Sequence, residues 1–94
     1  MNPADRFKID NLHEILQEIE KTGRLESLHD LEDRIIRQIA DLVDEGTEAA
    51  KAKLTTLERS LHQELQFVPR SGFLISALKN AIAGALSAAK LSLF

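Results

Sequence analysis

Apolar residues recur along this chain at spacings of three and four, which is the pattern of amphipathic α-helices. A first segment follows Asn2 and Pro3, two residues that favour a helix N-terminus. Its apolar stripe comprises Phe7, Leu12, Ile15, Leu16 and Ile19. A second segment has the widest apolar face, made of Leu25, Leu28, Leu31, Ile35, Ile36, Ile39, Leu42 and Val43. A third carries a narrow leucine seam close to the heptad spacing of a coiled coil, with Leu54, Leu57, Leu61 and Leu65.

Short breaks separate these segments at residues that favour helix ends. Gly23 and Gly46 each follow an apolar segment, and glycine readily adopts the left-handed conformation that ends a helix. Thr47 is placed to cap the third helix, and Ser27 with Asp30 could form a capping box at the start of the second. These signals predict helices over about 3–21, 26–45 and 48–66.

The last part of the chain differs from the rest in charge. Residues 1–66 contain 9 basic and all 15 acidic residues and sum to −6, whereas residues 67–94 contain three basic residues and no acid and sum to +3. Pro69 interrupts the helical pattern and holds Val68 extended, so we expect a hinge over 67–72. A fourth helix is predicted over about 72–91.

This fourth helix is amphipathic. At about 100° per residue, one side carries a Leu and Ile stripe with alanines that allow close approach to the second helix, while Lys79 and Lys90 fall on the other side. Three arrangements stay open: the helix closes its own bundle, it swaps with or faces a partner, or it lies on a membrane surface. A membrane span is disfavoured, because Lys79 and Asn80 would lie inside the hydrocarbon.

Composition agrees with helices throughout the chain. The 94 residues include two Pro, four Gly, no Trp and no Tyr, and this length suits a single domain over 1–94. We therefore predict an all-α fold, an antiparallel up-down bundle of three to four helices whose fourth helix closes the bundle, swaps or faces a partner.

The sequence contains no recognisable catalytic, cofactor or metal motif. His13, His29 and His62 lie on three different predicted helices without the spacing of metal ligands, and the carboxylates fall on polar helix faces. No phosphate-binding loop or nucleophile elbow occurs. We therefore predict no cofactor, no metal and no enzymatic activity.

Charge and cysteine content limit the classes of partner and the cellular location that we expect. The net charge of −3 argues against nucleic-acid binding, which normally requires a basic face. The chain has no cysteine and its N-terminus lacks the uninterrupted apolar run of a secretory signal, so we expect a cytoplasmic location.

The expected function is protein–protein association, as a homo-oligomer, with the C-terminal amphipathic helix as the main contact element. A monomer would leave some of the apolar residues near the C-terminus exposed, which favours self-association. The predicted interaction surface comprises Phe67, Phe73, Leu74, Leu78, Ile82, Leu86, Leu91 and Phe94. The alternative function is a peripheral membrane- or lipid-associated protein that uses the cationic amphipathic helix 72–94.

Overall fold

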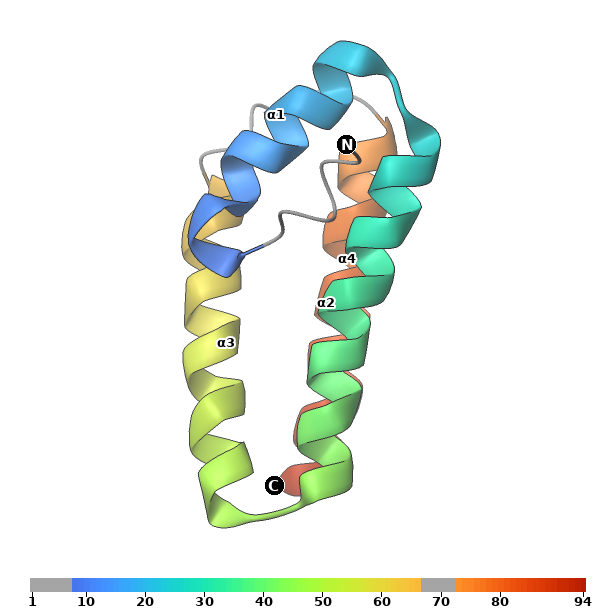
Figure 1. Ribbon diagram of the computed structural model, residues 1–94. Coiled ribbons are helices and arrows are strands. Elements are labelled where there is room, and N and C mark those ends of the chain that lie inside the picture. Colours follow the sequence, from blue (N-terminus) through green and yellow to red (C-terminus); the bar gives the residue numbers. More distant parts are fainter. Residues whose placement is uncertain (1–7, 67–72) are drawn as a thin grey trace.

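The computed structural model describes residues 8–66 and 73–94, and over these residues it consists of helices without strands. The helices are α1 (Leu12–Thr22), preceded by the 3-10 turn η2 (Ile9–Asn11), α2 (Leu25–Glu45), α3 (Glu48–Gln66) and α4 (Phe73–Leu93). Successive helices run in opposite directions (Figure 1). The predicted all-α, up-down bundle is confirmed, with four helices.

The helices α2, α3 and α4 run along the length of the bundle, whereas the shorter α1 crosses only one end of it (Figure 1). α4 packs most extensively on α2, which runs parallel to it, and much less on the antiparallel α3. α1 contacts α2 and α3. The fourth helix therefore closes its own bundle along α2, which is one of the three arrangements that the sequence left open.

The predicted glycine stops and the threonine cap are confirmed. Gly23 and Gly46 have φ values of +68° and +64°, and their N–H groups donate to the carbonyl oxygens four residues earlier, at 2.8 and 3.1 Å. An L-residue rarely adopts this conformation, which explains glycine at both positions. The N–H of Ala50 donates to Thr47 Oγ1 at 3.1 Å, so Thr47 caps α3.

The first helix begins later than predicted. Lys8 is extended, with φ −139° and ψ 147°, and the 3-10 turn follows it before α1 begins at Leu12. The Lys8 N–H donates to Asn11 Oδ1 at 3.0 Å. Asparagine side chains compete with the helical hydrogen bonds in this way, so a continuous helix over 3–21 was wrong for residues 8–11. Its part before Lys8 lies outside the described residues.

The second helix starts within one residue of its predicted bound, but without the predicted cap. α2 begins at Leu25 after an extended Arg24, one turn closer to Gly23 than a cap at Ser27 would place it. Ser27 lies inside the helix and is buried. Because its side chain is within the bundle, the predicted capping box between Ser27 and Asp30 does not start this helix.

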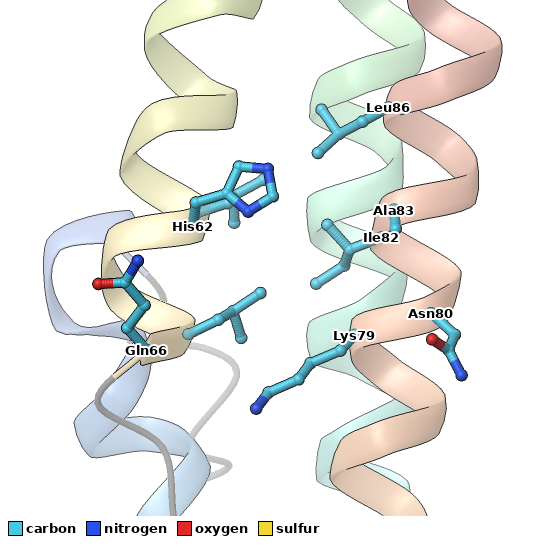
Figure 2. Close-up of a pocket in the computed structure, with 9 residues that line it drawn as sticks. His62, Gln66, Lys79, Asn80, Ile82, Ala83 and Leu86 are labelled. Atoms are coloured by element: carbon cyan, nitrogen blue, oxygen red, sulfur yellow. The ribbon is translucent and has the colours of Figure 1, made fainter.

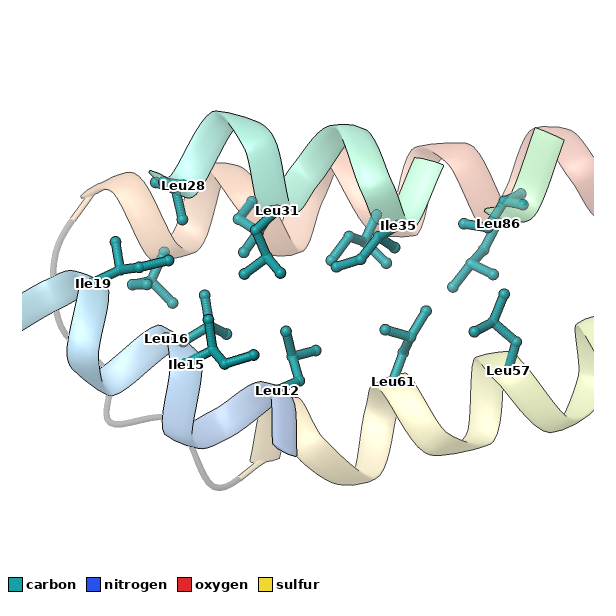
Figure 3. Close-up of a cluster of buried hydrophobic side chains, with 14 of the residues drawn as sticks. Leu12, Ile15, Leu16, Ile19, Leu28, Leu31, Ile35, Leu57, Leu61 and Leu86 are labelled. Atoms are coloured by element: carbon teal, nitrogen blue, oxygen red, sulfur yellow. The ribbon is translucent and has the colours of Figure 1, made fainter. Parts of the chain in front are cut away.

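One hydrophobic core joins the apolar stripes of all four helices (Figure 3). The largest fully buried side chains are Leu12, Leu16, Leu31, Ile35, Leu54, Leu61, Leu78 and Ile82. Burying a Leu or Ile side chain stabilises a fold by about 1.5–3 kcal/mol, so these stripes account for much of the folding free energy. No helix within the described ranges is long and apolar enough to cross a membrane.

Candidate functional site

Three residues of the predicted interaction surface lie inside the chain's own core. Leu78, Ile82 and Leu86 are 1%, 2% and 3% exposed. They belong to the stripe by which α4 packs in the bundle, together with Ile75 and Ala89. In this conformation these side chains are not available to a partner, because the surrounding helices cover them.

Two other residues of that predicted surface are on the outside. Leu91 is 87% exposed and Phe94 is 71% exposed, which makes them the most exposed large apolar residues among those the structure describes. Phe67 lies outside the described residues, as do the side chains of Phe73 and Leu74. The structure thus separates the predicted surface into a buried stripe and an exposed C-terminal end.

The part of α4 that points directly away from the bundle carries no charge. Its outward direction, opposite the buried stripe, is occupied by Ala77, Gly84, Ser87, Ala88 and Leu91, all of them exposed, with the exposed polar Asn80 beside them. We call these five residues the α4 outer face. The two lysines of this helix do not belong to the outer face.

Both lysines of α4 lie on the side that faces α3. The Lys90 ammonium forms an ion pair with Glu58 of α3, and Lys79 lines a groove between α3 and α4. The Lys51 ammonium of α3 lies 5.8 Å from the centroid of the Phe94 ring, a cation–π distance. The positive side of α4 is therefore turned toward the acidic part of its own chain, and the α4 outer face stays neutral.

Two open grooves flank α4. The groove toward α3 has a volume of about 390 Å³. It is lined by Leu61, His62, Leu65, Gln66, Lys79, Asn80, Ile82, Ala83 and Leu86, several of which are drawn in Figure 2. The groove toward α2 has a volume of about 270 Å³. It is lined by Ile36, Ile39, Ala40, Val43, Asp44, Ala85, Ala88, Ala89 and Ser92.

A partly buried polar contact joins α1 to α3. His13 Nδ1 lies 2.8 Å from Glu64 Oε1, and Glu64 is only 9% exposed. Sequence reasoning missed this pair, since the two residues are 51 positions apart. A signal was present, because Glu64 occupies a position of the leucine seam, three residues after Leu61 and seven after Leu57. The contact positions α1 on the bundle.

The described residues offer no cluster suited to metal binding. No three His, Asp or Glu side chains within 8–66 and 73–94 are grouped as ligands. His29 and His62 are exposed. Every buried side-chain polar atom in these ranges has a hydrogen-bond partner, so no orphaned group points to a bound ion. The surfaces of α4 are the strongest candidates for function.

Comparison with known proteins identifies no relative. The chain matches no protein-family model, no curated protein and no solved structure. Its function is therefore inferred from its own surfaces.

Proposed function

We propose that this chain acts through protein–protein association rather than catalysis, and that it forms a homodimer through the α4 outer face. The observation that carries the proposal is that α4 is uncharged around most of its circumference. Its charged residues are Lys79 and Lys90, and both lie on the side facing α3. A helix without a charged solvent side is typical of buried helices, so a covering partner is expected.

The long helix α2 differs from α4 in having many charged residues on its solvent side. Exposed residues of α2 include Asp30, Asp33, Arg34, Arg37, Asp41 and Asp44. A solvated helix normally has such a charged side. The α4 outer face instead combines four small residues with Leu91, which is 87% exposed. This difference within one chain favours α4 as the contact element.

The spacing of the outer face suits pairing with a second copy. Ala77, Gly84 and Leu91 are separated by seven residues each, so they follow one line along the helix. In an antiparallel pair centred on Gly84, Leu91 of each copy would lie over Ala77 of the other. Large residues would thus meet small ones in a two-fold symmetric contact, and neither lysine would face its own symmetry mate.

The expected dimer is modest in affinity. From Ala77 to Leu91 the face is about 21 Å long at 1.5 Å per residue, shorter than a standard interface requires. Burial of each exposed leucine would contribute about 1.5–3 kcal/mol before the entropic costs of association. We expect a dissociation constant in the micromolar range.

The alternative, association with a membrane surface, draws less support from the geometry. A membrane-surface helix inserts large apolar side chains into the headgroup region. On α4, Leu78, Ile82 and Leu86 are buried in the bundle, so Leu91 and Phe94 are the large apolar residues that remain exposed among its described side chains. The outer face is otherwise composed of small residues, which suit close helix contacts better than lipid.

Sedimentation analysis of Leu91→Glu tests the proposal. Wild type should show a concentration-dependent monomer–dimer equilibrium, and the variant should weaken dimerisation by at least about tenfold. Ala52→Glu is the matched control, because Ala52 is exposed on α3, away from the outer face. Helicity should be unchanged in both variants. A wild type that stays monomeric at high micromolar concentration, or a dimer that Leu91→Glu leaves intact, would refute the proposal.

A further inference from the structure

We propose that the groove between α3 and α4 binds a single-chain amphiphile with a carboxylate head group, that is, a monomeric fatty acid. The floor of the groove is apolar, formed by Leu61 and Leu65 of α3 and by Ile82 and Leu86 of α4. Its volume of about 390 Å³ falls within the range of small-molecule sites, which often lie between the helices of bundles.

The groove exists because α3 and α4 are held apart. α4 packs on α2 and makes few contacts with α3. Figure 2 shows Ile82 and Leu86 pointing from α4 toward α3, with His62 pointing back toward them. Ala83, which is exposed, leaves the mouth unobstructed. Between Lys79 and Leu86 the groove extends about 10 Å along the helix axis, a length suited to an alkyl chain of medium length.

The charge of the lining selects the head group. The chain has a net charge of −3, yet none of the lining residues that the structure describes is acidic. The nearby carboxylates are engaged elsewhere, since Glu58 pairs with Lys90 and Glu64 contacts His13 on α1. An apolar groove with a cation at its rim is complementary to an amphiphile that has an alkyl chain and an anionic head group.

Lys79 is the residue assigned to the carboxylate. It is half-buried, and its ammonium makes no hydrogen bond or ion pair with any residue the structure describes, in contrast to Lys51 and Lys90. In Figure 2 it extends from α4 toward α3 at the end of the groove nearest Gln66. The head group would lie at this end, with the Gln66 amide as a second donor, and the alkyl chain would run toward Leu86.

This site is independent of the proposed dimer. The groove residues lie on the flank of α4 toward α3, and none of them belongs to the α4 outer face. Loss of dimerisation in Leu91→Glu should therefore leave amphiphile binding unchanged. Failure of one proposal does not imply failure of the other.

The test is a titration of the full chain, followed by two-dimensional NMR, with decanoate below its micellar concentration. Chemical-shift changes should concentrate at residues 61–66 and 79–86. Decanol, which keeps the alkyl chain and lacks the charge, should bind about fivefold more weakly, as expected for loss of one partly exposed ion pair. Changes spread over other surfaces, or equal affinity for decanol and decanoate, would overturn the assignment.

Three variants locate the site. Lys79→Gln should weaken decanoate binding about fivefold and leave decanol binding unchanged, whereas Lys53→Gln, an exposed lysine elsewhere on α3, should alter neither. Ala83→Phe should fill the groove and abolish binding of both ligands while the chain stays folded. Lys79→Gln and Lys53→Gln variants with equal affinities would overturn the proposal. Binding to phosphatidylglycerol vesicles without any response to monomeric decanoate would overturn it in favour of a membrane surface.

Discussion

The packing of α4 on its own bundle can be tested with two identical substitutions on one helix. Leu78 and Leu91 both belong to α4, but Leu78 is 1% exposed and Leu91 is 87% exposed. Replacing each with alanine removes the same atoms from the same helix. Any difference between the variants therefore reports the burial of the side chain rather than helix propensity.

The expected magnitudes differ severalfold. A buried Leu→Ala substitution costs about 2–5 kcal/mol, because the apolar contacts are lost and a cavity remains. Leu91→Ala should change the free energy of unfolding by less than about 0.5 kcal/mol, as is typical of exposed positions. A chain of this length has a total stability of about 5–14 kcal/mol, so Leu78→Ala should stay folded with a markedly lower midpoint. The melting temperature should fall by at least about 8 °C.

Urea denaturation followed by circular dichroism provides the measurement. It should be made at low micromolar protein, below the expected dissociation constant of the dimer, so that association does not contribute to stability. A second series at tenfold higher concentration, made in the Leu91→Glu background so that the outer-face dimer does not contribute, separates the intrachain core from a swapped one, because swapping makes the midpoint strongly concentration-dependent.

A small effect of Leu78→Ala would refute the packing of α4 in the core. If Leu78→Ala costs less than about 1 kcal/mol, α4 is not part of the cooperative core, since cavity formation at a fully buried leucine cannot be so small. The helix would then be a detachable tail, and the interpretation of its outer face as the exposed side would fail with it.

Three further tests follow from single features of the fold, each measured by urea denaturation at low micromolar concentration. Gly46→Ala should lower the free energy of unfolding by about 1 kcal/mol, because φ is +64° there; no loss would mean that α2 ends in another conformation. Gly84→Ala should raise it by up to about 1 kcal/mol, because the residue is inside a helix and an added Cβ has no atom within 4 Å; a loss would contradict an open face. In a double-mutant cycle of His13→Ala and Glu64→Ala, the coupling should be about 0.5–1.5 kcal/mol, and additive effects would contradict their contact.

Much of the fold was predictable because its signals are local. Most residues of the apolar stripes identified in the sequence form the core, although Leu25 of the second stripe is 47% exposed. Gly23, Gly46 and Thr47 act as the pattern predicted. Helix starts were less predictable. Asn11 accepts a hydrogen bond from the Lys8 backbone, and Ser27 is buried inside α2, because side-chain hydrogen bonds and tertiary burial decide between similar capping signals.

The candidate site was only partly predictable. Sequence reasoning placed Leu91 in the predicted interaction surface, and the structure finds it 87% exposed. It grouped Leu91 with Leu78, Ile82 and Leu86 in one surface, although these three are in the core. Periodicity tells which residues share a face of a helix, and it does not tell which partner covers that face.

The sequence by itself determined the four amphipathic helices, the glycines that end two of them, and the acid-free, cationic character of the last one. Only the tertiary structure decided that α4 packs along the parallel α2, that its lysines turn toward α3, and that Glu64 meets His13. These outcomes depend on contacts between residues far apart in the chain. Local spacing cannot specify them, because the rotation of a helix about its axis is set by how its apolar stripe packs against its neighbours.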